Sequence, residues 1–160
     1  MATFGFDPTT TLSADELNQG KGFGVGSKAT DDKGRVWQYV QASGAITQYD
    51  FVTIDEDFQA AALGKTAVDD GHGIGVAQAA FDDNDYGWVL VYSGYDGILG
   101  RVGGSCAADV ALYTSGTSGV LDDESTSQTK LDGIVVVAAN TSTSAAAVEV
   151  LISFPRSSTF

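Results

Sequence analysis

The sequence has almost no cysteine: Cys106 stands alone among 160 residues, so no disulfide can form within the chain. The fold therefore does not depend on an oxidising compartment. An isolated cysteine most simply packs as a small apolar side chain, and we expect Cys106 to do so rather than to act as a nucleophile. Histidine is equally scarce, and His72 alone cannot supply a zinc site of the usual multi-histidine kinds.

Basic residues are also few. Eight lysines and arginines face 21 acidic residues, which gives a net charge of -13 at pH 7 and a pI near 4.1. Because such a molecule repels phosphate backbones, we expect no direct binding to nucleic acid. Charged residues make up only 18% of the chain, so small and uncharged polar side chains must form much of its surface. This kind of surface suits contact with other proteins, and solvated β-proteins share it.

Long apolar runs are missing as well. No stretch of 18 apolar residues occurs, so we expect no membrane-spanning helix. The start of the chain, MATFGFDPTTT, lacks the positive charge and the apolar core of a secretory signal. We therefore expect a soluble protein that is not exported by its own sequence. A chain of this length can bury a sizeable core as one domain without a disulfide or a metal.

The clearest pattern that is present is a period-two alternation of side chains within residues 34–94. Val36 and Val40 fall on one face of a strand, while Trp37 and Tyr39 fall on the other. Because both faces carry large apolar groups, the pattern predicts a strand that is covered on both sides.

Further strands are predicted along the chain, separated by turn residues at intervals of roughly 8 to 12 residues. They lie at 51–54, 73–77, 88–92, 98–102, 105–113 (weak), 131–138 and 147–154. This series predicts an all-β fold, an antiparallel β-barrel or β-sandwich. The run 131–138 is apolar throughout, so we expect both of its faces to be buried.

The last predicted strand places four apolar side chains on one face: Val148, Val150, Ile152 and Phe154. Pro155 is expected to end this strand, because proline cannot donate to a β-ladder. The sequence shows no internal repeat and no linker after residue 33. We therefore predict a single β-domain over residues 34–160.

Residues 1–33 have a different character and are predicted to form a short N-terminal arm. The sequence from Ser13 to Glu16 has the form of a capping box, and Gly20 is placed to end a helix of one or two turns. The glycine-rich stretch that follows, residues 20–28, predicts a loop that leads into the first clear strand.

Three apolar side chains of the arm, Phe4, Phe6 and Leu12, need a surface to pack against. An arm outside the core finds that surface either on its own domain or on a neighbouring subunit, and the sequence leaves both alternatives open. We take these three residues as the candidate protein-interface residues.

Known sequence patterns of catalytic and cofactor sites do not fit. Residues 24–29 match a GxGxxA pattern, but the strand before it and the helix after it that a dinucleotide site needs are not predicted. His72 lies between two glycines in a turn, and no serine has a GxSxG surrounding. The acidic turn 82–85 could ligate calcium, but a 12-residue calcium loop fails at Tyr86 and Ser93.

Paired carboxylates of the glycosidase type are not excluded by the sequence, yet nothing selects a pair among the 21 acids. We therefore expect no catalytic residues, no cofactor and no metal, and a protein that is not an enzyme. Several aromatic residues on predicted strands could instead form a sugar-stacking platform, although aromatic side chains on strands more often lie in the core or in subunit contacts. They are Trp37, Tyr39, Trp88, Tyr92 and Tyr95.

The order of segments resembles one group of tailed-phage capsid decoration, or cement, proteins of the small β-rich trimeric type. The resemblance spans residues 22–155, and the arm of residues 1–33 has no matching motif. It is carried by small residues, aromatic strands and turns at 37–42, 50–54, 73–77, 87–94, 111–121 and 131–134.

This resemblance implies a structural virion protein, made in the host cytoplasm and located on the outer surface of the assembled capsid. It implies a homotrimer that binds the major capsid protein, bridges neighbouring capsomers and stabilises the head against internal DNA pressure. On this hypothesis Phe4, Phe6 and Leu12 would be anchors in a neighbouring subunit. The alternative is a carbohydrate- or host-binding β-module of a phage fibre.

Overall fold

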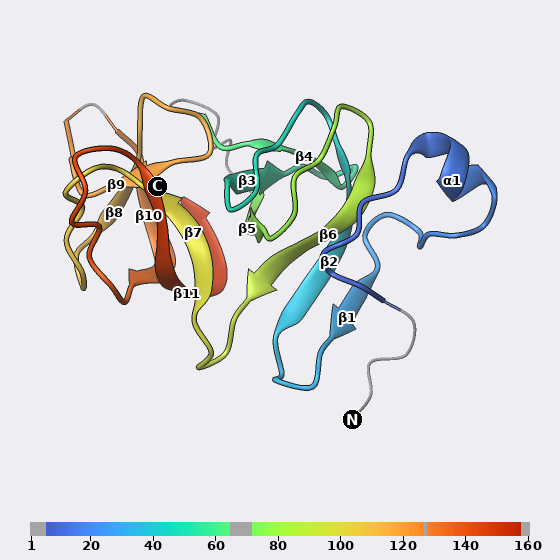
Figure 1. Cartoon of the computed structure of the whole chain (residues 1–160), viewed down its shortest axis with the longest axis horizontal. Coiled ribbons are helices and arrows are strands. Elements are labelled where there is room, and N and C mark those ends of the chain that lie inside the picture. Colours follow the sequence, from blue (N-terminus) through green and yellow to red (C-terminus); the bar gives the residue numbers. More distant parts are fainter. Residues whose placement is uncertain (1–5, 65–71, 127, 158–160) are drawn as a thin grey trace.

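The computed structural model describes residues 6–64, 72–126 and 128–157, and it is nearly all β, with 43% strand and 3% helix. The all-β prediction is therefore confirmed. The elements are α1 (Ala14–Asn18), β1 (Lys28–Thr30), β2 (Val36–Ala42), β3 (Phe51–Ile54), β4 (Gln59–Ala62), β5 (Gly73–Ala77), β6 (Tyr86–Tyr92), β7 (Ile98–Val102), β8 (Leu112–Thr114), β9 (Leu121–Asp122), β10 (Lys130–Val136) and β11 (Ala146–Ser157). They form two lobes that lie side by side (Figure 1).

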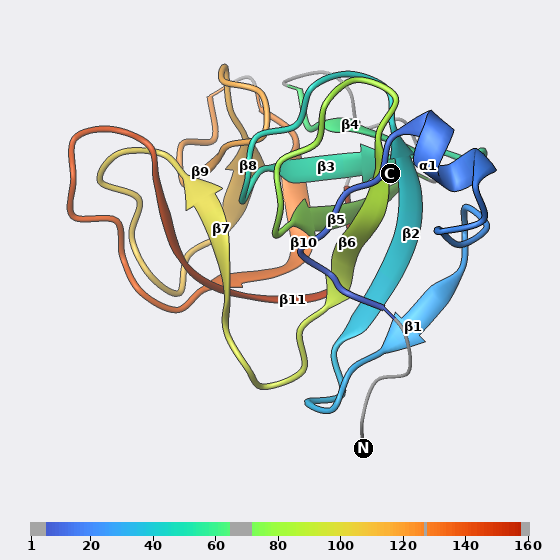
Figure 2. The ribbon, with the colours of Figure 1, turned by 45° about the vertical axis from the view of Figure 1, so that its right-hand side comes forward.

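Strands β2 to β6 close into a five-stranded barrel, which we call the N-terminal barrel. The hydrogen-bonded order is β2-β4-β3-β5-β6, and β6 pairs back to β2 to close the circle. All of these pairs are antiparallel except β2 with β4. In Figure 2, β2 and β6 run side by side and β3 crosses them at a steep angle.

Both faces of the barrel strands are buried, as the alternation in β2 predicts. Val40 and Val89 belong to a cluster of mostly small apolar side chains to which all five strands contribute, as expected for the narrow interior of a five-stranded barrel. Trp37 and Trp88 belong instead to the larger core cluster, on the outer face. The two tryptophans are 2% and 3% exposed, so the prediction of a doubly covered strand is confirmed.

Strands β7 to β11 form a second circle of pairings, the C-terminal ring, in the order β11-β10-β8-β9-β7 with β7 paired back to β11. Its order repeats that of the barrel: in both, the first strand pairs parallel with the third and antiparallel with the fifth. In both, the second strand lies between the third and the fourth. The chain therefore contains a duplicated topology, which the sequence did not predict.

The two lobes share one core. The larger apolar cluster joins Phe51 and Leu90 of the barrel to Leu112 and Ile152 of the ring. Polar contacts cross the same boundary: the buried Ser93 hydroxyl accepts a hydrogen bond from the Ile152 amide at 2.9 Å, and the Ser93 amide donates to the Ile152 carbonyl at 2.9 Å. The barrel and the ring are thus packed together along β6 and β11.

The helix of the arm forms where the capping-box sequence predicts it. The Ser13 hydroxyl accepts a hydrogen bond from the Glu16 amide, and the Glu16 carboxylate accepts one from the Ser13 amide at 3.0 Å. Gly20 follows the helix with a positive φ of 77°, which favours glycine. The arm then adds the short strand β1 to β2, a pairing that the sequence did not predict.

The structure corrects three details in the C-terminal ring. Of residues 105–113, only Leu112 and Tyr113 lie in a strand, β8. One face of strand β10 is exposed to solvent: Val135 is 43% exposed, and Val137, just after the strand, is 42% exposed. The apolar run 131–138 therefore does not have two buried faces.

Pro155 lies within β11 and does not end it, which overturns the third expectation. The register between β10 and β11 shifts between Asp132 and Ile134, with Gly133 at φ 84°. Proline is tolerated at such a bulge because its missing N–H leaves no ladder bond unmade.

Candidate interaction sites

The arm covers an aromatic face of the barrel. The Phe6 ring packs against Trp88 at a centroid distance of 4.8 Å and against Trp37 at 6.3 Å. The Phe23 ring packs edge-on against Trp88 at 5.0 Å and Tyr39 at 5.6 Å. In Figure 2 the dark blue arm runs across β6 and β2. Trp37, Tyr39 and Trp88 are therefore buried and do not form an open sugar platform.

Two of the three predicted interface residues, Phe6 and Leu12, contact the barrel. Phe6 is half-buried and makes the ring contacts just described. Leu12 is half-buried, and its backbone exchanges two hydrogen bonds with Tyr86, at 2.8 and 2.7 Å. Both residues therefore contact their own barrel, and their role as anchors in a neighbouring subunit stays a prediction. Phe4 lies outside the described residues.

A cavity of about 160 Å³ remains between the arm and the barrel. Its lining includes Asp7, Lys21, Phe23, Tyr39 and Trp88. The Tyr39 hydroxyl is buried and makes no hydrogen bond of acceptable geometry with a described residue. Burial raises the pKa of Tyr39, and the nearby Phe23 backbone amide opposes that effect. The cavity therefore holds an unsatisfied donor.

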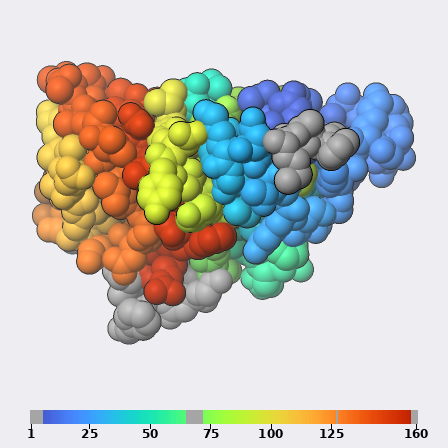
Figure 3. Space-filling view, turned by 90° about the horizontal axis from the view of Figure 1, so that it is seen from below, coloured from blue at the N-terminus to red at the C-terminus, as the bar shows by residue number. Residues whose placement is uncertain are grey.

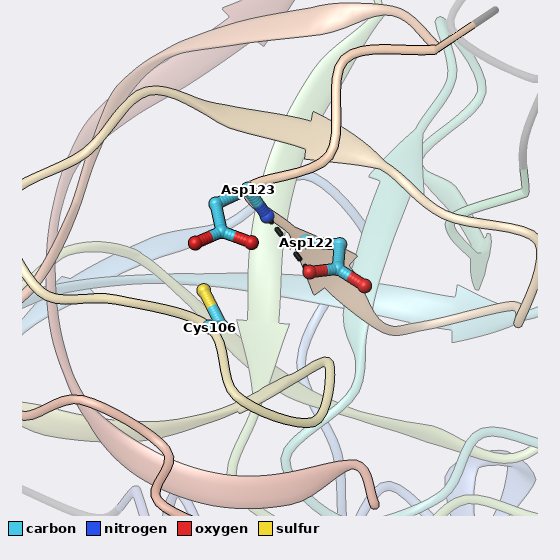
Figure 4. A group of neighbouring side chains, drawn as sticks. All are labelled: Cys106, Asp122 and Asp123. Carbon is cyan, nitrogen blue, oxygen red and sulfur yellow. Dashed lines mark hydrogen bonds between the residues drawn. The ribbon is translucent and has the colours of Figure 1, made fainter. Parts of the chain in front are cut away.

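Among the described residues, one group brings three possible metal-ligand side chains together: Cys106, Asp122 and Asp123, whose ligand atoms lie within 4.8 Å of one another (Figure 4). Cys106 lies in the loop after β7, and the two aspartates lie at and after β9. The Asp123 amide donates to the Asp122 carboxylate at 2.9 Å, and the Asp123 carboxylate accepts from the Ala107 amide at 2.9 Å.

The surroundings of this group favour the protonated forms of the Cys106 thiol and the Asp122 carboxyl. Burial, followed by the charges of Asp123 and Asp122, raises the pKa of the Cys106 thiol to about 11. Burial also raises the pKa of Asp122, and the neighbouring Asp123 carboxylate adds to this effect. A neutral thiol is a poor nucleophile and a poor ligand. The arrangement fits a packed side chain, as the sequence analysis expects for Cys106.

The other chemical candidates from the sequence do not converge on a site. His72 Nε2 lies 3.3 Å from Glu56 Oε2, an exposed carboxylate. In the acidic turn 82–85, the Asp85 carboxylate accepts a bond from the Asp82 amide, so it serves the turn itself. Residues 24–29 form a turn followed by β1, with no helix after it, so the dinucleotide pattern lacks its structural context.

The structure exposes an aromatic residue that the sequence predicts on one strand face with Val150 and Ile152. Phe154 is 54% exposed with φ 45°, a left-handed conformation that is an outlier for a bulky residue. Its ring stacks on Tyr92 with a centroid distance of 5.4 Å and an interplanar angle of 17°. The bulge opposite Gly133 reverses the alternation here, so Pro155 is buried in place of Phe154. The predicted shared face with Val150 and Ile152 is therefore wrong.

Phe154 borders a cavity of about 180 Å³ at one end of the barrel, which we call the barrel mouth. Strands β2 and β5 begin and β6 ends at this point, and the end of β11 lies across it. Seen from below, the red end of β11 lies next to the yellow-green end of β6 (Figure 3). The mouth is lined by Lys28, Gln38, His72, Gly73, Ile74, Val91, Phe154, Pro155 and Arg156.

Comparisons with protein-family models, with curated proteins and with solved structures each found no match. Among the described residues, no helix has the length and hydropathy needed to cross a bilayer.

Proposed function

We propose that the protein is a structural virion protein that binds the outer surface of an assembled phage capsid and bridges neighbouring capsomers, and so stabilises the head against internal DNA pressure. The partner is the major capsid protein, and the assembled form is a homotrimer. The sequence resemblance over residues 22–155 motivates this proposal.

The observation that carries the proposal is the joining of two lobes of the same strand order through one core. A bridging protein needs two contact surfaces held at a fixed spacing. Two lobes packed along β6 and β11 provide such surfaces within one chain. Several weak contacts made together would raise the overall affinity by about 10² to 10⁴ over a single contact.

The distribution of exposed apolar side chains supports a role in protein contact. They occur on both lobes, which suits contact over area. Those exposed by more than a third are Phe23, Val25, Tyr95, Leu99, Val110, Val135, Val137 and Phe154.

The direct test is co-sedimentation of the purified full-length protein with mature capsids and with unexpanded precursor capsids, together with mass spectrometry of purified virions. We expect saturable binding to the mature capsid and a copy number in virions close to that of the major capsid protein. A protein that binds neither capsid form, or that occurs in only a few copies per virion, would rule out the lattice role.

The arm can be tested by single substitutions. Deleting residues 1–20 would also uncover Trp37 and Trp88, so it would mix binding with folding. We therefore compare Phe4→Ala with Phe6→Ala. If the arm is an anchor, Phe4→Ala should weaken capsid binding with an unchanged melting temperature, whereas Phe6→Ala should lower the melting temperature because its ring covers the tryptophans.

A carbohydrate- or host-binding module remains the second candidate, and one observation favours it. Tyr95 is fully exposed, and Phe154 with its stacked partner Tyr92 presents an aromatic face to solvent. A glycan array separates the two functions: specific glycan binding that is lost in Phe154→Ala or Tyr95→Ala, without any binding to capsids, would favour the module.

A further inference from the structure

Two basic residues that form no ion pair with any described residue line the barrel mouth. Four other bases pair with carboxylates, in the pairs Lys33–Asp96, Arg35–Asp31, Arg101–Asp50 and Lys130–Asp132. Lys28 and Arg156 form no ion pair with a described residue, yet both line the mouth cavity. In a molecule with a net charge of -13, the described lining of this cavity carries two bases and no carboxylate. Just outside the lining, the Glu56 carboxylate pairs with the lining His72 at 3.3 Å.

The backbone holds these bases beside an aromatic ring. Lys28 lies opposite Gln38 in the β1–β2 ladder, and Arg156 lies opposite Asp132 in the β10–β11 ladder. Between them, the strained Phe154 keeps its ring outside, against Tyr92. Backbone strain of this kind is costly and gathers at binding sites. Stacking on Tyr92 limits the freedom of the ring, so a partner would meet a pre-organised surface.

The chemistry of the mouth defines its ligand. Lys28 and Arg156 offer charge-assisted hydrogen bonds to an anion, and a planar guanidinium matches a carboxylate in particular. Ile74, Val91 and Phe154 offer an apolar wall next to them. The volume of about 180 Å³ exceeds the roughly 150 Å³ of a cavity that holds a benzene ring. A carboxylate next to an aromatic or aliphatic group would satisfy both halves of the site.

We propose that the barrel mouth binds a carboxylate of a protein partner, an Asp or Glu side chain or a chain terminus with an apolar neighbour, through Lys28, Arg156 and Phe154. The identity of that partner as the capsid protein rests on the proposed function, whereas the site itself does not. A second copy of this chain also carries many carboxylates, but its net charge opposes the approach at long range.

The first experiment uses two small probes of equal shape. Benzoate carries the carboxylate and the ring, and benzamide carries the ring alone. We titrate the ¹⁵N-labelled full-length protein with each and follow the amide shifts of Lys28, Gly73 and Arg156. We expect saturable shifts with benzoate, with a Kd on the order of 1 mM, and at least about tenfold weaker binding of benzamide. Equal binding of the two probes, or no binding of benzoate, would overturn the proposal.

Substitutions locate the site. Lys28→Gln and Arg156→Gln should each weaken benzoate binding by about fivefold or more. Lys21→Gln removes an equal charge from a base that lines the other cavity, so it is the matched control and should leave the Kd unchanged. If all three variants weaken binding equally, the effect is one of net charge and the site is refuted. Melting temperatures confirm that each variant is folded.

Peptides distinguish the source of the carboxylate. Acetyl-Gly-Glu-Phe-Gly-amide offers a side-chain carboxylate, acetyl-Gly-Phe offers a terminal one, and acetyl-Gly-Gln-Phe-Gly-amide offers none. At least one of the first two should bind more tightly than benzoate, since a protein source adds contacts at Phe154, and Phe154→Ala should remove that gain. If neither acidic peptide binds better than the neutral one, the ligand is not a protein carboxylate.

Failure of this site and failure of the proposed function give different results. Capsid binding that persists undiminished in the Lys28→Gln/Arg156→Gln double variant would overturn the site and leave the capsid role in place. Absence of capsid binding by the unaltered protein, with normal benzoate binding, would overturn the capsid role and leave the site in place.

Discussion

At the scale of single residues, Asp31 shows how one carboxylate organises a turn. Burial alone would raise the pKa of Asp31, but hydrogen bonds from Trp37 and Arg35 and from the Lys33 backbone outweigh it, so the pKa is lowered. The Arg35 side chain donates at 2.6 Å and the Trp37 indole at 3.0 Å. The carboxylate thereby joins the turn after β1 to the aromatic face under the arm.

The buried thiol at Cys106 predicts a loss of stability at alkaline pH. Its pKa is raised from 9.0 to about 11 in the folded protein, whereas the unfolded chain loses the proton near its ordinary value. The stabilising contribution is therefore complete below about pH 9 and is lost as the pH rises toward 11, by roughly 2 kcal/mol. Urea unfolding between pH 8 and 11 should show this loss in the unaltered protein and a smaller one in Cys106→Ala.

Alkylation provides the independent check on Cys106. At pH 8 the native thiol should react with iodoacetamide about 100-fold more slowly than the thiol of the urea-unfolded chain, since far less thiolate is present and the side chain is buried. Rapid labelling of the native protein would show that the thiol is accessible and ionised.

At the scale of elements, the end of β11 depends on Gly133. This glycine has φ 84°, and a Cβ placed on it would lie 2.7 Å from the Ser153 carbonyl oxygen. The strand can approach so closely only because the side chain is absent. The bulge in turn exposes Phe154 and accommodates Pro155, so one glycine decides the geometry of the barrel mouth.

Gly133→Ala is expected to destabilise the protein by about 2–3 kcal/mol, because it combines an unfavourable φ with a clash against backbone. Gly34→Ala is the matched control, since Gly34 has a similar φ of 76° but nothing within 4 Å of the added Cβ. It should cost about 1 kcal/mol. Urea denaturation of both variants tests the difference, and equal costs would show that the close approach at Gly133 is unimportant.

At the scale of the whole molecule, the junction between the lobes contains a buried charge pair. Asp50 in the barrel is 3% exposed and accepts hydrogen bonds from Arg101 of the ring at 2.5 Å and from the Thr47 amide at 3.0 Å. The Arg101 amide also donates to the Tyr49 carbonyl at 2.9 Å. Next to the pair, Phe51 contacts the position of Gly100, where a Cβ would lie 2.8 Å from its ring. The lobes are therefore joined by an ion pair and by close packing of Phe51 against Gly100.

Arg101→Ala should destabilise the protein by about 2–3 kcal/mol, because it leaves the Asp50 carboxylate buried without its cation. The estimate lies at the low end for buried pairs since the Arg101 side chain is 26% exposed. Lys33→Ala removes the exposed pair with Asp96 and should cost less than about 1 kcal/mol. Thermal and urea unfolding measure both, and a cost for Arg101→Ala no larger than that for Lys33→Ala would show that the pair does not hold the lobes together.

Part of the candidate sites could be predicted from the sequence. The aromatic residues of β2 and β6 are visible in its alternation, but that they are covered by Phe6 and Phe23 is not. The barrel mouth was missed, because Lys28 and Arg156 lie 128 positions apart and only the β1–β2 and β6–β11 pairings bring them together. The sequence does hold a signal for the repeated strand order: the similar runs GIGV at 73–76 and GIVV at 133–136. The first lies in β5, the fourth strand of the barrel, and the second lies in β10, the fourth strand of the ring.

The sequence by itself determined what depends on neighbours along the chain: the β-rich class, most strand positions, the capped helix and the net charge. These follow from local alternation, turn chemistry and composition, which act over a few residues. Only the tertiary structure decided the closure of the barrel, the repeated strand order, the outward turn of Phe154 and the meeting of Lys28 and Arg156 at the mouth. Each of these depends on which distant strands pair and in which register, and local physical chemistry does not specify that choice.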